Sequence, residues 1–316
     1  MTSPLPTRTL GCTGFETTVL GFGAMELREE GPRGRGLSET EAGRILGNVL
    51  DHGINLIDTS IDYGLSEERI GRHLSHRRDE FVLATKCGCT LGWRSTEQEP
   101  GPGPHDYSRS NIVAGVEQSL RRLATDHLDV LQVHMSPSLS VMEEHDVIGT
   151  LRDLQEQDKV RFIGMSGTLP NLPDHLATRA FDVVQIPYSL LQRDHETLIS
   201  RAAETGAGVI IRGGVARGAL SGPDGQLGGP ARVQPHVADA WQHVDLRDLL
   251  DGSDPVEFTL RYTISHPAMT SAIVGTIDPD HLGANVHAAI AGPLPPEVYE
   301  ETQRRLDAVG LSPTMA

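Results

Sequence analysis

Apolar residues along the chain follow two alternating spacings. After Ser38 they recur at Ala42, Ile45, Leu46, Val49 and Leu50. This is the 3.6-residue spacing of an amphipathic helix, and Ser38 with Glu41 forms a Ser-x-x-Glu capping box that marks its start. Directly after Gly53, residues 54–58 form a short apolar run bounded by polar residues. That run predicts a buried strand following the helix.

The same unit of helix and strand recurs to the end of the chain. Further runs that predict strands occupy residues 18–22, 81–85, 128–133, 160–164, 181–186, 208–211 and 271–274. Helical spacing occupies residues 112–123, 147–154, 198–203 and 256–264, the last beginning at Pro255, and a last short helix is expected from Pro279. Strands that alternate with helices indicate a parallel sheet. Eight strands in 316 residues favour a closed (β/α)8 TIM barrel, formed by one domain over residues 1–316, over a doubly wound sheet.

Four segments fall outside this alternation. Arg8, Thr9 and Leu10, followed by a turn at Gly11 and Gly14, indicate a small N-terminal β-hairpin that plugs the barrel floor. Residues 222–239 are rich in Gly, Pro and polar residues and are expected to form a long loop. A shorter irregular stretch at residues 92–105 is expected on the same barrel face. A short, polar, helix-like segment at residues 297–309 is expected to contribute little to a lid over the site.

Composition narrows the classes of function. The net charge of −16 disfavours nucleic-acid binding, because no positive stripe is available to displace counterions. The cysteines Cys12, Cys87 and Cys89 have no partner cluster at zinc-like spacing, so free thiols and no metal are expected. No apolar run approaches the roughly 18 residues of a membrane span, and the N-terminus lacks a signal-peptide pattern. We therefore expect a cytoplasmic protein without a membrane partner.

Polar and titratable side chains stand where the expected strands end. Asp58, Lys86, His134, Ser166, Gln185 and Arg212 close six of them, Gly275 closes the last, and Tyr63 follows Asp58 by five residues. In a barrel all C-terminal strand ends meet at one rim, where barrel active sites are found. Polar groups at the ends of so many buried strands are costly without a shared purpose. The sequence therefore predicts an active site at this rim.

Several motifs resemble those of the aldo-keto reductases. Residues 53–64 read Gly-Ile-Asn-Leu-Ile-Asp-Thr-Ser-Ile-Asp-Tyr-Gly, and Ser66, Glu67, Ile70 and Gly71 follow. Similar motifs come later in family order: Thr85, Lys86 and Cys87, then residues 120–129 leading to His134, then residues 159–164. The similarity covers essentially the whole chain. It implies a nicotinamide-dependent carbonyl reductase whose catalytic tetrad is Asp58, Tyr63, Lys86 and His134.

These residue types suit carbonyl reduction, which puts a hydride on carbon and a proton on oxygen. A free tyrosine, with a pKa of about 10, is a poor proton-transfer group at neutral pH. An ammonium beside the phenol favours phenolate, so we expect Lys86 to lower the pKa of Tyr63. Asp58 is expected to keep Lys86 charged, and His134 to orient the substrate oxygen and share in proton transfer. Taken singly, His134 is more often a structural residue and Asp58 a simple cap.

The resemblance also implies a dinucleotide laid across the barrel rim, since no Gly-x-Gly-x-x-Gly fingerprint follows the first strand. Ser166 and Gln185 would hold the nicotinamide carboxamide. The pyrophosphate would be lined by Gly213, Gly214, Val215, Ala216 and Arg217. Gly275 and Thr276 would take the adenosine end, with Asn285 on the adenine. The other residues implied in cofactor binding are Gly23, Ala24, Met25, Asp58, Gly167, Arg212, Ile277, His281 and Ala284.

Two positions near the nicotinamide depart from the family pattern. Gly167 stands where the family commonly has Asn, which removes one hydrogen bond to the carboxamide. Arg212 stands where many relatives carry an aromatic that stacks on the nicotinamide. A guanidinium can stack on a ring, but it would repel the cationic oxidised form and so favour the reduced cofactor. Alternatively, Arg212 turns to a carboxylate of the protein or binds a carboxylate or phosphate of the substrate.

The third departure concerns the choice between the two nicotinamide cofactors. Relatives that bind the 2′-phosphate place Arg or Lys around Gly275, Ile277 and His281. Here only His281 can help, whereas Asp278 and Asp280 would repel a phosphate. Family habit favours NADP(H) and local charge does not. We expect NADP(H), with NAD(H) as the alternative.

Three functions fit this sequence. The first is reduction of a small aldehyde, ketone or sugar-like carbonyl, with specificity set by Met25, Trp93, Arg212 and the two long loops. The second is a cofactor-binding regulatory subunit resembling potassium-channel beta subunits, which share this fold and tetrad. The third is a non-redox dehydratase or isomerase on the same barrel. We prefer the reductase, because nothing else in the sequence indicates a membrane partner.

Overall fold

Parallel strands close into a barrel in the computed structural model, which describes residues 4–28, 36–93, 103–222, 226–227 and 233–314. The strand order around the barrel is β10-β3-β4-β5-β6-β7-β8-β9. The bounds are β3 Leu20–Gly23, β4 Leu56–Asp58, β5 Val82–Cys87, β6 Leu128–His134, β7 Val160–Ser166, β8 Val183–Pro187, β9 Gly208–Arg212 and β10 Ser271–Val274. Each is parallel to both neighbours. The predicted (β/α)8 TIM barrel is confirmed.

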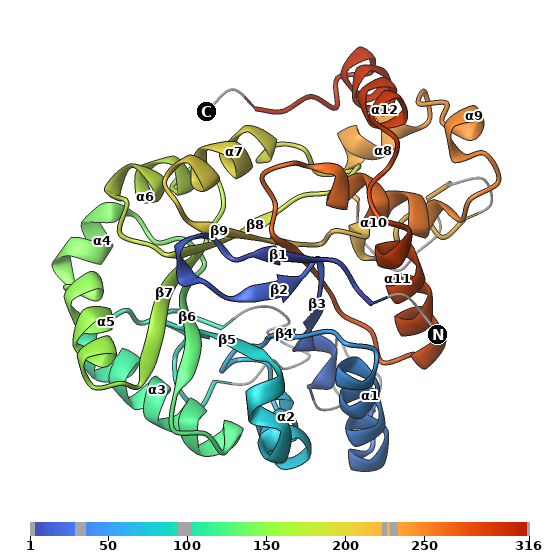
Figure 1. Cartoon of the computed structure of the whole chain (residues 1–316). Coiled ribbons are helices and arrows are strands. Elements are labelled where there is room, and N and C mark those ends of the chain that lie inside the picture. Colours follow the sequence, from blue (N-terminus) through green and yellow to red (C-terminus); the bar gives the residue numbers. More distant parts are fainter. Residues whose placement is uncertain (1–3, 29–35, 94–102, 223–225, 228–232, 315–316) are drawn as a thin grey trace.

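Helices surround the barrel (Figure 1). Their bounds are α1 Glu39–Asp51, α2 Ser66–Leu74, α3 Arg109–Leu123, α4 Leu139–Glu144, α5 Val147–Glu156, α6 Leu172–Thr178, α7 Glu196–Glu204, α8 Pro235–Trp241, α9 Arg247–Leu250, α10 Pro255–Ser265, α11 Pro279–Ala291 and α12 Pro296–Ala308. The predicted capping box of Ser38 and Glu41 is present at α1. Within the described residues, no helix combines the length and apolar character that crossing a bilayer requires.

The N-terminal hairpin lies across one end of the barrel (Figure 1). Strands β1 Thr7–Thr9 and β2 Glu16–Thr18 pair antiparallel on either side of the short 3-10 helix η1 Gly11–Thr13. Leu10, at the turn, is fully buried. It packs with residues inside the barrel, namely Leu56, Val82, Ala84, Val130, Val183, Ile210 and Ile273. The predicted hairpin is therefore confirmed, and Leu10 is the residue that fills the barrel floor.

Close backbone approach fixes the turn of this hairpin. Gly11 has a φ of +53°, and a Cβ there would lie 2.1 Å from the backbone nitrogen of Gly208. Glycine is the residue that adopts this positive φ without strain and that has no Cβ to collide with the Gly208 backbone. The strand expected at residues 18–22 begins later, at Leu20, because Thr18 pairs with Thr7 in the hairpin. The chain thus passes from the floor directly into the barrel wall.

The two long loops depart in part from expectation. Of residues 222–239, predicted as loop, α8 Pro235–Trp241 is helical from Pro235 onward. Proline is well suited to the first turn of a helix, and Val237 and Trp241, four residues apart, are buried on one face. That part of the loop prediction is wrong. Residues 223–225, 228–232 and, in the other loop, 94–102 lie outside the described residues.

Candidate active site

The ends of three neighbouring strands and one turn bring the four tetrad residues to one rim. Asp58 ends β4, Lys86 is near the end of β5, and His134 ends β6. All three are buried, at 2%, 2% and 8% exposure respectively. Tyr63 lies in the turn after β4, where its backbone nitrogen donates to Ser60 O at 3.0 Å. The Lys86 ammonium lies 5.0 Å from the centroid of the Tyr63 ring.

Lys86 and Asp58 form a buried ion pair. The Lys86 Nζ donates to Asp58 Oδ2 and to the backbone oxygen of Thr59, both at 2.7 Å. Burial alone would lower the pKa of Lys86, but the charge and hydrogen bond of Asp58, together with Tyr63 and Asp62, outweigh burial, and the pKa lies above its usual value. A buried ammonium without a partner would be strongly unfavourable. Asp58 therefore keeps Lys86 charged beside Tyr63, as the sequence led us to expect.

Two amides hold the other oxygen of the Asp58 carboxylate. Gln132 Nε2 and Gln185 Nε2 donate to Asp58 Oδ1 at 2.7 and 2.8 Å. Sequence reasoning missed Gln132. A signal was available, because Gln132 precedes His134 by two residues on β6 and alternation places both on one face. The carboxylate is thus fixed from both sides by neutral donors and by Lys86.

The pKa of the Tyr63 phenol differs in direction from our expectation. Burial raises it above its usual value, and Lys86 opposes this without overcoming it, while Asp58 and Asp62 add to the rise. The expected lowering by Lys86 is present as one contribution but is not the net result. Tyr63 therefore holds its proton in the free protein, which suits a proton donor.

The first turn of α2 supports the turn that carries Tyr63. Ser66 N donates to the backbone oxygen of Tyr63 at 3.0 Å, and Ser66 Oγ donates to Ala24 O at 2.8 Å. Thr85 Oγ1, beside Lys86 in sequence, donates to Glu67 Oε1 at 2.8 Å. The Ser-Glu motif after Tyr63 therefore ties α2 to the barrel strands rather than acting on a substrate.

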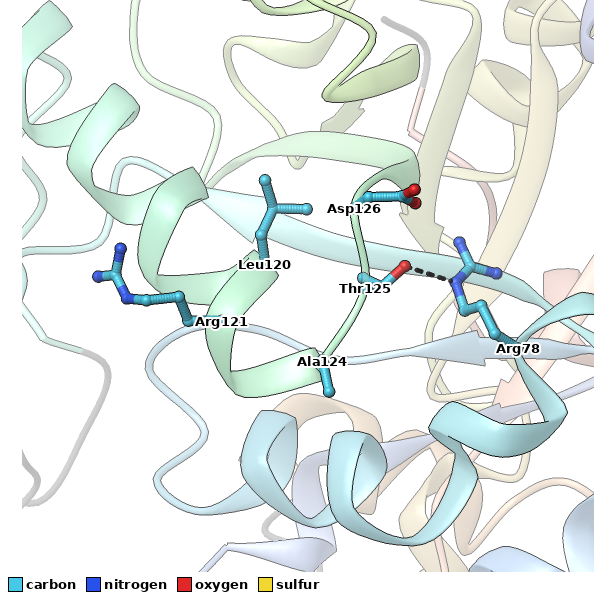
Figure 2. Close-up of a pocket in the computed structure, with 6 residues that line it drawn as sticks. All are labelled: Arg78, Leu120, Arg121, Ala124, Thr125 and Asp126. Carbon is cyan, nitrogen blue, oxygen red and sulfur yellow. Dashed lines mark hydrogen bonds between the residues drawn. The ribbon is translucent and has the colours of Figure 1, made fainter.

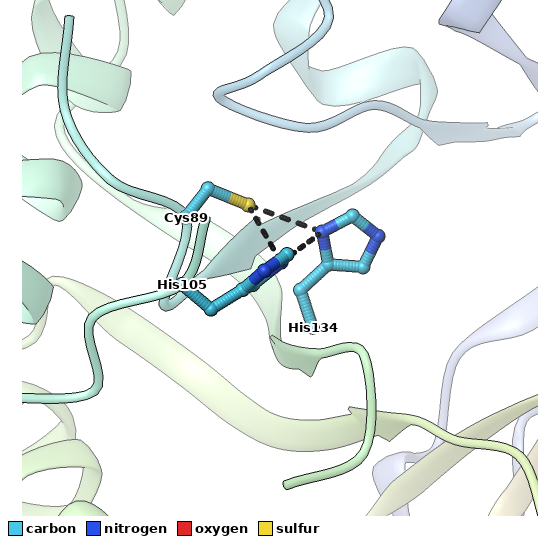
Figure 3. A group of neighbouring side chains, drawn as sticks. All are labelled: Cys89, His105 and His134. Atoms are coloured by element: carbon cyan, nitrogen blue, oxygen red, sulfur yellow. Dashed lines mark hydrogen bonds between the residues drawn. The ribbon is translucent and has the colours of Figure 1, made fainter. Parts of the chain in front are cut away.

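His134 lies in a cluster that the sequence did not reveal. Its Nδ1 is 3.1 Å from Cys89 Sγ, 3.5 Å from His105 Nε2 and 3.9 Å from Asp62 Oδ1. Figure 3 shows the thiol and the two rings pointing toward one another. Burial lowers the pKa of His134 to about 3, against the opposing charge of Asp62. The imidazole is therefore neutral at neutral pH and can donate a hydrogen bond from one ring nitrogen only. The cysteines Cys12, Cys87 and Cys89 are all free, as expected.

The residues implied in cofactor binding line a continuous arc of the same rim. Ser166 and Gln185 are register partners on β7 and β8, with Ser166 Oγ donating to Gln185 Oε1 at 3.1 Å. Residues 213–217 follow β9, and residues 275–277 follow the adjacent β10. Gly23 ends β3, Ala24 and Met25 follow it in the 3-10 helix η2 Ala24–Leu27, and α11 carries His281, Ala284 and Asn285.

Polar groups without protein partners make this arc suitable for a dinucleotide. Within the described residues, the side-chain amide of Asn285 makes no hydrogen bond and the guanidinium of Arg212 makes no ion pair. The alternative in which Arg212 turns to a protein carboxylate is therefore not observed in that part of the chain. Burial lowers the pKa of Arg212, and Tyr63 is the largest opposing influence. A mostly buried cation therefore lies close to Tyr63 without an ion-pair partner among the described residues.

A separate depression lies away from this rim. It has a volume of about 470 Å³ and is lined by Arg78, Leu120, Arg121, Ala124, Thr125 and Asp126 (Figure 2). Thr125 and Asp126 precede β6 and Arg78 precedes β5, so the depression lies at the N-terminal ends of these strands. Arg78 Nε donates to Thr125 Oγ1 there at 3.2 Å. No tetrad residue lines it, and barrel chemistry belongs to the opposite end.

The fold and the rim together define a class, a TIM-barrel enzyme whose buried lysine–carboxylate pair adjoins a phenol and a neutral imidazole. Comparison with known proteins gives the family. The sequence profile of the Aldo/keto reductase family matches residues 19–306. The chain belongs to the aldo/keto reductase family.

Individual relatives agree with this assignment over nearly the full length. The uncharacterized oxidoreductase YqkF of Bacillus subtilis is 27% identical over 310 residues, covering 94% of this chain and 95% of the relative. The L-galactose dehydrogenase of Arabidopsis thaliana is 27% identical, covering 89% and 87%. Among solved structures, the holo form of aldo-keto reductase AKR11C1 from Bacillus halodurans is 30% identical. Its TM-score is 0.79, with 95% of this chain and 96% of that chain covered.

The family assignment selects among the three functions considered from the sequence. The protein is an NAD(P)H-dependent oxidoreductase that reduces carbonyl groups of small molecules. Neither a channel regulatory subunit nor a non-redox dehydratase or isomerase is favoured by these relatives. The expectation of a nicotinamide cofactor is confirmed at this level.

Proposed function

We propose that Tyr63 delivers the proton in the reduction of an aldehyde, ketone or sugar-like carbonyl to an alcohol. The observation that carries this proposal is the Lys86 ammonium, which lies 5.0 Å from the Tyr63 ring centroid and 2.7 Å from Asp58 Oδ2. Family members use a tyrosine, lysine, aspartate and histidine in this way, and Tyr63, Lys86, Asp58 and His134 match them residue by residue. The geometry gives each residue a distinct task.

Reduction requires a hydride on the carbonyl carbon and a proton on its oxygen. The nicotinamide, when bound, supplies the hydride. Tyr63 supplies the proton, because burial keeps the phenol protonated in the free protein. As the phenol gives up its proton, the adjacent Lys86 ammonium stabilises the phenolate. Asp58 keeps Lys86 in place, and neutral His134 donates one hydrogen bond that orients the substrate oxygen.

Ser166 and Gln185 are proposed to bind the nicotinamide carboxamide, and Asn285 the adenine. Gln185 Nε2 donates to Asp58 and Ser166 Oγ donates to Gln185 Oε1, so each of these two oxygens keeps a lone pair that can accept a hydrogen bond from the carboxamide. We also propose a preference for NADP(H), which rests on family habit. Of the positions where relatives place Arg or Lys, only the exposed His281 offers a group that can bind the 2′-phosphate, and Asp278 and Asp280 work against it.

Arg212 is proposed to bind an anionic group of the substrate. Its guanidinium is close enough to Tyr63 and His134 to affect the pKa of both. It also makes no ion pair within the described residues. A bidentate interaction with a carboxylate or phosphate would satisfy this cation. We therefore expect carbonyl substrates that carry a carboxylate or phosphate to be preferred.

A panel of carbonyl compounds tests these proposals together. Each compound with a carboxylate or phosphate is paired with a neutral analogue, and NADPH consumption is measured alongside the alcohol formed. We expect stoichiometric conversion and a higher kcat/KM for the charged member of each pair. A higher kcat/KM with NADPH than with NADH is the outcome expected for the cofactor. Equal values within pairs would remove the role of Arg212, and a large NADH preference would reverse the cofactor assignment.

A further inference from the structure

Cys89, His105 and His134 bring three metal-binding atoms together at one side of the rim. Cys89 Sγ lies 3.1 Å from His134 Nδ1 and 3.8 Å from His105 Nε2, and the two ring nitrogens are 3.5 Å apart. Cys89 and His134 are buried and His105 is partly exposed. Figure 3 shows all three atoms facing a common point. The carbonyl-reduction mechanism uses only His134 of this cluster.

We propose that Cys89, His105 and His134 form a three-ligand binding site for Zn²⁺ whose fourth position is open. In a tetrahedral zinc site the ligand atoms lie about 2.0–2.3 Å from the ion, which places N and S ligands about 3.3–3.6 Å from one another. The three distances in this cluster, 3.1, 3.5 and 3.8 Å, bracket that range. An ion could therefore enter with small side-chain movements. Thiolate with imidazole is also the donor set that zinc favours.

Neighbouring contacts hold the three ligands in place before any ion binds. The backbones of Cys89 and His105 form an antiparallel bridge, and Asn111 Nδ2 donates to Cys89 O at 3.1 Å. The ring of Tyr107 stacks on that of His105, with the ring centroids 5.9 Å apart. The Tyr107 hydroxyl donates a hydrogen bond to the backbone oxygen of His134 at 2.6 Å. Second-layer contacts of this kind orient metal ligands and strengthen binding.

Charges of both signs lie near the cluster. Asp62 Oδ1, 3.9 Å from His134 Nδ1, favours a cation, whereas the positive charges of Lys86 and Arg212 also reach His134 and oppose one. The same short distances also fit plain thiol–imidazole hydrogen bonds, which would hold His134 without any ion. Metal binding separates the two possibilities, because hydrogen bonds alone give no stoichiometric uptake of zinc.

A consequence for turnover rests on the proposed function. An ion with an open position binds carbonyl oxygens, and at this place it would compete with Tyr63 for the substrate oxygen. It would also fix the ring of His134. Zn²⁺ is therefore expected to inhibit the reductase, and a chelator to restore it.

Direct metal binding is the primary test, since it does not depend on catalysis. Metal-free full-length protein is titrated with Zn²⁺ by calorimetry and with Co²⁺ by absorption spectroscopy. We expect one ion per chain and a thiolate-to-cobalt charge-transfer band. Cys89→Ser should abolish the band, and Cys89→Ser and His105→Asn should each weaken Zn²⁺ binding by at least about tenfold, because losing even an outer-shell partner costs about 10- to 100-fold. Cys12→Ser, at an exposed cysteine, is the matched control and should bind as the wild type does.

Two results would contradict the proposed zinc site. One is no stoichiometric Zn²⁺ uptake by the wild type at micromolar metal, and the other is unchanged affinity in folded Cys89→Ser and His105→Asn. His105 is only partly buried, so His105→Asn keeps the test valid if Cys89→Ser fails to fold. Zn²⁺ that binds at Cys89 without slowing carbonyl reduction would refute the inhibitory role. Inactivity of the metal-free wild type would instead count against the proposed function.

Discussion

At the scale of single residues, Asp58 is the centre of the site. One of its oxygens accepts from Lys86, and the other accepts from Gln132 and Gln185. Lys86 in turn stands beside Tyr63. A buried carboxylate with this many donors is rigid. The position of the ammonium relative to the phenol therefore depends on side chains that never touch a substrate.

Gln132→Leu tests this dependence. The substitution keeps the approximate volume but removes one charge-assisted hydrogen bond to Asp58. We expect a loss of about 1.5–3 kcal/mol in the free energy of unfolding and a several-fold lower kcat/KM. Urea unfolding and steady-state kinetics measure both. Gln242→Leu, at an exposed position, is the control and should change neither. Wild-type stability in Gln132→Leu would show that this amide does not support the carboxylate.

Glu67 gives a prediction about pH and stability. Burial raises the pKa of this carboxyl, and the hydrogen bond from Thr85 and the charge of Arg122, 3.5 Å from Glu67 Oε2, oppose the rise. The folded protein therefore holds a proton above pH about 4.3, where the unfolded chain releases it. Stability must fall as pH rises through the window between the two pKa values. Glu67→Gln carries no such proton, so its stability relative to the wild type should increase with pH across that window.

Urea unfolding of both proteins at a series of pH values, starting near pH 4, gives the comparison. A stability difference that stays constant or shrinks as pH rises would mean that the carboxyl of Glu67 is not destabilised by burial. The expected trend would show that burying the Glu67 carboxylate, in the motif that supports the Tyr63 turn, costs folding free energy.

At the scale of elements, the hairpin β1–β2 and the rim loops act at opposite ends of the barrel. Leu10 fills the floor among the first residues of β4, β5 and β8, whereas the tetrad stands at the C-terminal ends. Stability and chemistry are therefore separated along the barrel axis. A substitution at the barrel floor should therefore change the free energy of unfolding and leave kcat and KM unchanged.

Leu10→Ala makes that separation measurable. The cavity left beneath the barrel should lower the free energy of unfolding by about 2–5 kcal/mol. The kcat and KM of the protein that remains folded should match the wild type. Thr7→Ala, on the exposed part of the same hairpin, should stay within about 0.5 kcal/mol. Altered kinetics in Leu10→Ala at full folding would show that the floor and the rim are coupled.

Elements were predictable where periodicity and local capping agreed. The capping box at Ser38 and the apolar run before Asp58 both lead to elements found in the structure. The helix at α8 was missed because its two buried residues, Val237 and Trp241, are too few to establish a period within a polar segment. The start of the first barrel strand was predicted too early, at Thr18. In the structure Thr18 pairs with Thr7 in the hairpin, and no pattern in the sequence indicates this pairing.

At the scale of the whole molecule, closure of the barrel decides which residues meet. The meeting of Asp58, Tyr63, Lys86 and His134 was predictable because each ends or follows a strand and so must reach the same rim. Their proposed catalytic roles came from the resemblance to the aldo-keto reductases. The cluster of Cys89, His105 and His134 was not predictable, because the spacing of these residues in the sequence resembles no metal motif. Only the fold brings their potential ligand atoms within 4.8 Å of one another. The rise in the pKa of Tyr63 was equally hidden, since burial is a property of the folded chain.

The central claim is that the phenol of Tyr63 provides the proton, and Tyr63→Phe tests it most directly. Removing one oxygen leaves the ring in place beside Lys86 and leaves the cofactor arc untouched. Turnover of the best carbonyl substrate should fall to near zero, while NADPH titration by protein fluorescence should give an unchanged Kd. Retained turnover with intact cofactor binding would contradict the account.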